Sequence, residues 1–139
     1  MSLVAVRDEL AKRLATLDGL RVYPVPPDTV SELPAAVIQP GQPLAEYGRT
    51  LSGGDVTYTF AVLLLTQSGD DEQAWQDLAA YLSPSGSSSV KAAVETSTGP
   101  NPGPADWLRV QRATEGGHVT YRKNAYWGAT FHVRAYVGG

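Results

Sequence analysis

The chain has 139 residues, of which 42% are hydrophobic and 18% are charged, and its net charge is −3. This length and hydrophobic content predict one domain with a sizeable core and exclude wholesale disorder. The absence of cysteine excludes disulfides and thiolate zinc sites, and no apolar run approaches the roughly 18 residues of a membrane span.

The first predicted element is an amphipathic helix over residues 2–17. Leucine and valine recur there at spacings of three and four, which places them on one helix face. The residues on that face are Leu3, Val6, Leu10, Leu14 and Leu17. Gly19 follows where a C-terminal cap belongs. Short apolar strands are expected at 20–25 and 35–39, with prolines marking an edge or a strand end.

The strongest predicted strand covers residues 56–66. Every second residue from Val56 to Leu64 is apolar, and residues 61–65 are apolar throughout. This pattern predicts a central strand that is exposed on one face early and covered on both faces later. Residues 40–55 and 96–105 show no periodicity, so we expect two long loops, which in a compact domain are usually functional or disordered.

Two helices are expected between that strand and the C-terminal third. The first has the acidic run Asp70-Asp71-Glu72 in its opening turn, where it suits the helix dipole. Its predicted buried residues are Trp75, Leu78, Ala79 and Leu82. A serine of the 87–89 run is expected to cap the next helix, which is buried through Val90, Ala93 and Val94.

The C-terminal third is predicted to be β structure, with strands at 106–113, 119–121 and 125–137. The last strand alternates strictly between two faces. One face holds Trp127, Ala129, Phe131, Val133, Ala135 and Val137, and the other holds Tyr126, Thr130, His132, Arg134 and Tyr136. The order of elements predicts a single α+β domain over residues 1–139, with helices packed on one face of a largely antiparallel, mixed sheet.

No set of residues in the chain indicates catalysis or a cofactor. His118 and His132 lack partners at metal-ligand spacing, and adjacent carboxylates in the acidic run point in different directions. Neither a nucleophile elbow nor a phosphate-binding loop is present. We therefore expect a protein that is not an enzyme and holds no metal or cofactor.

Charge is distributed unevenly along the chain. Residues 1–106 contain six Lys or Arg and thirteen Asp or Glu, whereas residues 107–139 contain five basic residues and one acid. Opposed charge blocks on one domain can join copies head to tail, although both blocks can equally be solvated surfaces that interleave in the fold. Basic and aromatic residues are interleaved over 121–127. In an acidic chain, this segment suits a protein interface better than a binding site for single-stranded nucleic acid.

Several segments together resemble the tail terminator proteins of long-tailed bacteriophages, the small α+β family that includes the minor tail protein U type. These segments are LDGLRVYPVPPD and PAAVIQP after the first helix, AWQDLAAYLSPSGSSSVKAAVE, and the final strand YWGATFHVRAYV. The resemblance is one of pattern and covers the whole chain in order.

The resemblance implies a structural virion protein that is made in the bacterial cytoplasm. Such proteins form a hexameric ring on the tail tube, stop its growth and present the surface to which the head attaches. The implied partners are further copies of the chain, the tail tube protein and the head–tail connector proteins, with no membrane and no specific nucleic acid. A head-closure or neck protein, and less so a small nucleic-acid-binding module, remain as alternatives.

A closed ring needs two different contact patches on each subunit. We expect residues 40–55 to contact the tube or connector, and the basic residues between 109 and 134 to pair with an acidic patch of the neighbouring subunit. The residues expected at these interfaces are Tyr47, Arg49, Asp70, Asp71, Arg109, Arg112, Arg122, Lys123, Tyr126 and Arg134.

Overall fold

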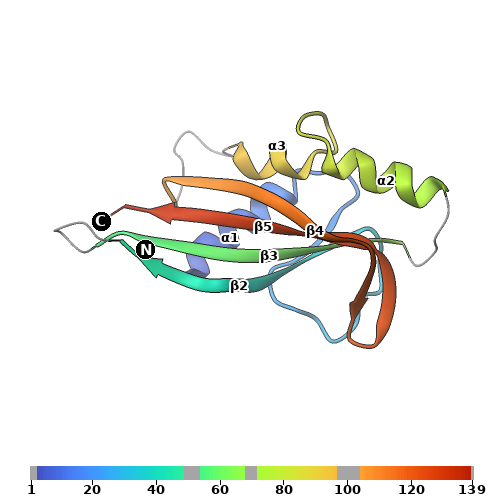
Figure 1. The fold of residues 1–139 in the computed structure, drawn as a ribbon, viewed down its shortest axis with the longest axis horizontal. Helices are drawn as coiled ribbons and strands as arrows, with labels where there is room; N and C mark the ends of the chain where they lie inside the picture. Colours follow the sequence, from blue (N-terminus) through green and yellow to red (C-terminus); the bar gives the residue numbers. More distant parts are fainter. Residues whose placement is uncertain (1–2, 49–53, 68–71, 97–103, 139) are drawn as a thin grey trace.

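The computed structural model describes residues 3–48, 54–67, 72–96 and 104–138 as an α+β domain, as the sequence predicts (Figure 1). The helices are α1 (Leu3–Leu14), α2 (Glu72–Leu82) and α3 (Val90–Glu95), and the strands are β1 (Arg21–Tyr23), β2 (Ala35–Tyr47), β3 (Val56–Gln67), β4 (Trp107–Tyr121) and β5 (Asn124–Val137). The sheet order is β1-β2-β3-β5-β4, and only the β1–β2 pair is parallel. No helix in the described ranges is long and apolar enough to cross a membrane.

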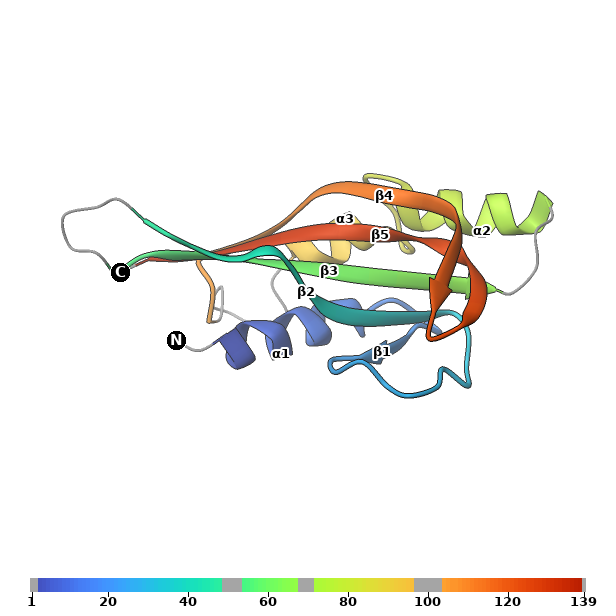
Figure 2. The ribbon, with the colours of Figure 1, turned by 60° about the horizontal axis from the view of Figure 1, so that its bottom comes forward.

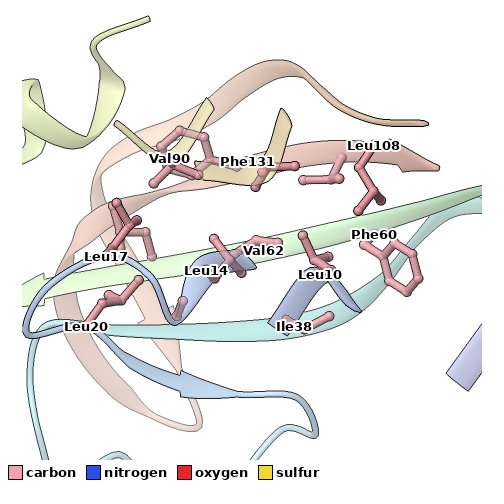
Figure 3. Close-up of a cluster of buried hydrophobic side chains, with 14 of the residues drawn as sticks. Leu10, Leu14, Leu17, Leu20, Ile38, Phe60, Val62, Val90, Leu108 and Phe131 are labelled. Carbon is pink, nitrogen blue, oxygen red and sulfur yellow. The ribbon is translucent and has the colours of Figure 1, made fainter. Parts of the chain in front are cut away.

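The main core lies between the three helices and one face of the sheet (Figure 3). The predicted apolar stripe packs there: Val6, Leu10 and Leu14 of α1 are buried, and so is Leu17 just after the helix. β3 contributes Phe60, Val62 and Leu64, and β5 contributes alternate residues from Trp127 to Val137. The predicted inward faces of these two central strands are therefore confirmed.

A second, smaller core lies on the opposite face of the sheet. Its buried residues are Val37, Leu63, Leu65, Val119, Tyr121 and Tyr126. Figure 2 shows why they are covered: the end of the β4–β5 hairpin bends toward the segment between β1 and β2. The Tyr121 hydroxyl donates a hydrogen bond to the Pro27 carbonyl there. The end of β3 is therefore covered on both faces, as predicted.

The prediction that Tyr126 lies at an exposed interface is wrong. Its side chain is only 8% exposed, because the bent hairpin turns it into the second core. Alternation along β5 assigned it correctly to the face away from the helices, but strand alternation does not show which part of that face another segment covers.

The rotation of α2 also differs from the prediction. Ala74 and Leu78 are the buried residues, whereas Trp75 is 59% exposed and Leu82 is 43% exposed. Ala79 is exposed as well. Apolar residues occupy more than half of this helix surface, so their spacing leaves two neighbouring stripes that could face the core.

Residues 40–47 are part of strand β2 rather than of a long loop. The register with β3 shifts between Pro40 and Ala45, which accommodates the extra residues as a bulge. β1 pairs with Ala35, Ala36 and Val37, so within the described ranges no strand lies on the outer side of the rest of β2. Prolines are tolerated at such an edge because no neighbouring strand needs their missing N–H. The second predicted loop, 96–105, lies mostly outside the described residues.

β4 is one strand over residues 107–121, not two separate strands. Register shifts occur between Val110 and Arg112 and between Thr114 and Gly117. The second shift ends at Gly117, whose φ of 111° favours glycine. These bulges interrupt the alternation of the sequence, which explains why the pattern suggested a break.

A buried ion pair joins α1 to the end of α3. Arg13 Nε lies 3.3 Å from Glu9 Oε1, and Arg13 Nη1 donates a 2.8 Å hydrogen bond to the Val94 carbonyl. Both side chains are almost fully buried. Because the C-terminal carbonyls of a helix lack intrahelical partners, this contact satisfies a group that would otherwise be unpaired.

Ser89 is the serine that caps α3, as the sequence predicts. Its Oγ accepts a 3.0 Å hydrogen bond from the Ala92 amide and donates one to the Ser83 carbonyl. We expect Ser89→Ala to lower the free energy of unfolding by about 1–2 kcal/mol, because both bonds are lost at a fully buried site. Chemical denaturation measures this, and the neighbouring Ser88→Ala, at an exposed position, is the matched control with no measurable change. Equal effects of the two variants would contradict the capping role.

Candidate partner-binding face of the sheet

The face of the sheet that the helices leave uncovered carries most of the basic side chains predicted at interfaces. We call its β4–β5 part the open face. Cross-strand pairs define it: Trp107 with Tyr136, Arg109 with Arg134, Arg112 with His132, and Thr114 with Thr130. The alternation of β5 predicts this placement of His132 and Arg134, and the bulge after Val110 brings Arg112 to the same face.

Aromatic stacking orders one end of the open face. The rings of Trp107 and Tyr136 stack with centroids 5.6 Å apart and an interplanar angle of 15°. The Arg109 guanidinium lies 4.8 Å from the centroid of the Trp107 ring. A cation held over an indole is worth about 0.5–1 kcal/mol at an exposed site, so Arg109 is held in place while its charge still faces solvent.

Arg134 and His132 have partners within the chain. Arg134 Nη2 lies 3.1 Å from Glu46 Oε1 on β2, and exposed pairs of this kind contribute at most about 1 kcal/mol. Arg134 Nε is buried and has no hydrogen-bond partner among the described residues. His132 Nε2 lies 2.7 Å from Thr114 Oγ1, which fixes the imidazole against β4. Arg134 thus offers less free charge than Arg109 and Arg112.

The bent hairpin turns the adjoining part of this face into a groove of about 1160 Å³. Polar and basic side chains line it, notably Arg112, Arg122, His118, His132, Gln39 and Gln42. None of the lining residues that the structure describes carries a carboxylate. A concave surface with this lining attracts anionic groups, because it concentrates positive potential between low-dielectric walls.

Arg122 and Lys123 form the two-residue turn of the β4–β5 hairpin. Their φ angles of 47° and 75° are left-handed, as such a turn requires at both positions. Arg122 Nε donates a 3.3 Å hydrogen bond to the Tyr121 hydroxyl, and this bond raises the pKa of Arg122 above its ordinary value. Both side chains are exposed at the tip, so the predicted interface role is sterically open to them.

The remaining predicted interface residues fall elsewhere. Tyr47 lies at the end of β2, opposite Val56 at the start of β3, and is 80% exposed. Arg49, Asp70 and Asp71 lie outside the described residues. The sequence interpretation missed Trp107 and Trp75. Trp107 could have been found, because it shares the alternation that exposes Arg109, whereas Trp75 sits on a helix whose rotation the pattern does not fix.

In the described ranges, no group of three or more His, Asp or Glu side chains could hold a metal ion. His118 instead packs edge-on against the Trp127 ring, with centroids 5.2 Å apart. No known family model matches the chain, and no curated protein sequence matches it.

Proposed function

We propose that this chain is a structural protein of virion assembly that forms a ring on the end of a phage tail tube, stops tube growth and presents the surface for head attachment. The observation that carries the proposal is the basic open face, with Arg109 and Arg112 exposed on it and the groove beside it. Such a face suits docking to an acidic protein surface, and charge complementarity of this kind sets the partner and the register of assembly.

The overall shape supports the same proposal. β2, β3 and β5 end together at one end of the sheet, where Tyr47, Val56 and Val137 lie in register, and α2 extends at the other end (Figures 1 and 2). Gly48 N donates a 3.0 Å hydrogen bond to the Asp55 carbonyl, so the two strands stay paired to the end of β2. This end of the sheet, with the exposed Tyr47 on it, gives a ring subunit a surface with which to reach a neighbouring component.

The decisive test adds the purified protein to polymerising tail tubes. We expect rings at the tube ends in negative-stain electron micrographs and tubes that stop lengthening. Tubes that keep growing in its presence, with bare ends, would overturn the proposal. Rings found on filled heads but never on tubes would point instead to a head-closure protein.

Tyr47 tests the role of the hairpin. We expect Tyr47→Ser to leave the melting temperature unchanged, because the side chain is 80% exposed, and to reduce the fraction of capped tubes at least tenfold. Thr57→Ser, on the neighbouring strand β3, is the control that leaves the Tyr47 side chain in place. Unchanged capping by Tyr47→Ser would remove the hairpin end from the docking surface.

A second candidate function follows from the Trp107–Tyr136 stack beside Arg109. Exposed aromatics next to cations are the platforms that single-stranded nucleic-acid binders use, and such binding weakens steeply with salt. Retention on single-stranded DNA at 0.05 M salt that Trp107→Ala abolishes would favour this function. We expect no retention beyond that of another acidic protein.

A further inference from the structure

Helix α2 carries an apolar stripe that the described chain covers only in part. Trp75, Ala79 and Leu82 follow one another at spacings of four and three on the side of α2 next to its buried face. We call these three residues the α2 stripe. The Trp75 ring packs edge-on against Trp127, with centroids 5.3 Å apart, which holds it in one orientation while most of its surface remains exposed. Anchors at this spacing are typical of helices that dock into a groove.

An apolar groove of about 250 Å³ lies elsewhere on the same chain. Its exposed apolar residues are Val4 on α1, Val25 after β1 and Leu44 on the outer edge of β2. We call it the α1 groove. Its walls come from the start of α1 and from the part of β2 that β1 leaves unpaired. A preformed apolar groove with exposed walls is the surface that an apolar helix stripe needs as a partner.

The two features lie far apart on the molecule. Figures 1 and 2 both place α2 at one end of the long axis and the start of α1 toward the other. A chain therefore cannot cover its own groove with its own stripe. Contact between unlike patches of two copies is heterologous, and such contacts form a ring if the rotation closes.

Charge favours the same pairing. Among the described residues that line the α1 groove, Arg7 is the charged one, and its Nη2 lies 3.0 Å from Asp8 Oδ1. The charged residues of α2 are Glu72 and Asp77, and residues 50–90 contain no Lys or Arg. Glu72 lies one helical turn before the stripe, at the spacing from Trp75 that puts both on neighbouring parts of the helix surface. The stripe thus has an acidic border, and the groove has an arginine whose pair with Asp8 is of the weak, exposed kind, which leaves it able to meet a second carboxylate.

We propose that the α2 stripe of one copy docks into the α1 groove of the next, and that this contact links subunits head to tail. The inference rests on the proposed ring and names its subunit contact. Trp75 is the anchor, because a large aromatic in an apolar groove contributes more than any other side chain of the stripe. The open face stays free for an acidic partner.

The first test uses two neighbouring alanines of α2. Ala79 lies in the stripe and Ala80 does not, yet both are exposed. We expect Ala79→Glu to sediment as a monomer at concentrations where the wild-type protein and Ala80→Glu form the same oligomer. Both variants keep the core, so equal thermal unfolding confirms that they fold. Wild-type oligomers in Ala79→Glu, or equal losses in both variants, would overturn the proposal.

The second test is complementation between two broken copies. Val25→Glu is expected to block the groove, with Thr29→Glu in the same segment as its matched control. Ala79→Glu keeps an intact groove and Val25→Glu keeps an intact stripe. Their equimolar mixture should therefore form dimers and nothing larger, while each alone stays monomeric. A mixture that remains monomeric would show that stripe and groove are not each other's partners.

These outcomes separate the contact from the proposed function. If the protein caps tail tubes as a ring and Ala79→Glu caps them equally well, the contact is wrong and the function stands. If the mixture of variants dimerises but the wild-type protein never caps a tube, the contact stands and the function fails. A wild-type protein that is monomeric both in solution and on tubes overturns the contact.

Discussion

Reversal of two charges on the open face, in the variant Arg109→Glu/Arg112→Glu, is expected to weaken docking to tail tubes about 100-fold. Both side chains are exposed, so the fold loses little. In the variant, the attraction toward an acidic surface becomes a repulsion. We expect each reversed residue to lower the docking affinity about tenfold, which is about 1.4 kcal/mol of binding free energy. The new carboxylates would also lie across from Arg134 and His132 and neutralise the remaining positive charge of this face.

The measurement is the fraction of capped tubes against protein concentration. Lys12→Glu/Arg21→Glu, on α1 and β1, makes the same change in net charge away from the open face and should cap as the wild type does. Wild-type capping should itself weaken at 1 M salt, where charges are screened beyond about 3 Å. Equal losses in both double variants would show that net charge, not this face, is responsible.

The same variant identifies the acidic partner. The uneven charge distribution along the chain predicts that the neighbouring copy supplies it, and in that case free rings and capping should be lost together. Rings that persist while capping fails place the acidic surface on the tail. Sedimentation of the free protein next to the capping assay distinguishes the two results.

Alternation and helical spacing were sufficient to predict the inward faces of α1, β3 and β5. α1, β5 and the first half of β3 have one apolar face and one more polar face, so their burial follows from the period alone. The predictions failed where the hydrophobic period is compatible with more than one arrangement. On α2 the apolar surface is too wide to fix the rotation. On β2 the lack of periodicity after residue 39 suggested a loop, although an unpaired edge tolerates the prolines at 40 and 43.

The candidate site was predictable only in part. The placement of Arg109 and Arg134 follows from the sequence, because each alternates with apolar residues, whereas Arg112 reaches this face only through the bulge after Val110. The groove does not follow, since it depends on the bend of the β4–β5 hairpin and on two bulges in β4. The burial of Tyr126 has the same cause. Long-range packing of a hairpin end on a distant segment leaves no periodic signal.

Gly128→Ala is expected to be the most destabilising single substitution considered, with a loss of about 3 kcal/mol or more. A Cβ at Gly128 would lie 1.8 Å from the Leu64 carbonyl oxygen and 2.9 Å from the Leu64 carbonyl carbon. Both atoms belong to the backbone of the central strand β3, so no side-chain rotation relieves the clash. The substitution must therefore push β3 and β5 apart at the centre of the sheet, where residues 62–66 are buried.

The register shift beside Gly128 connects the close approach of β3 and β5 to the exposed ring of Trp75. β3 and β5 slip between Leu65 and Gln67, and Thr66 Oγ1 donates a 2.8 Å hydrogen bond to the Trp127 carbonyl. Trp127 is the ring on which Trp75 rests. A displaced β5 would therefore loosen the anchor of the α2 stripe even in molecules that remain folded.

Gly116→Ala is the matched control for Gly128→Ala. A Cβ at Gly116 would meet no atom within 4 Å, and this residue is exposed. We expect it to leave the free energy of unfolding within about 0.5 kcal/mol of the wild type, as surface substitutions usually do. Urea denaturation followed by circular dichroism measures both. If Gly128→Ala unfolded at the wild-type midpoint, the two central strands would have to lie farther apart in solution, and Trp127 would not hold Trp75 in the orientation described.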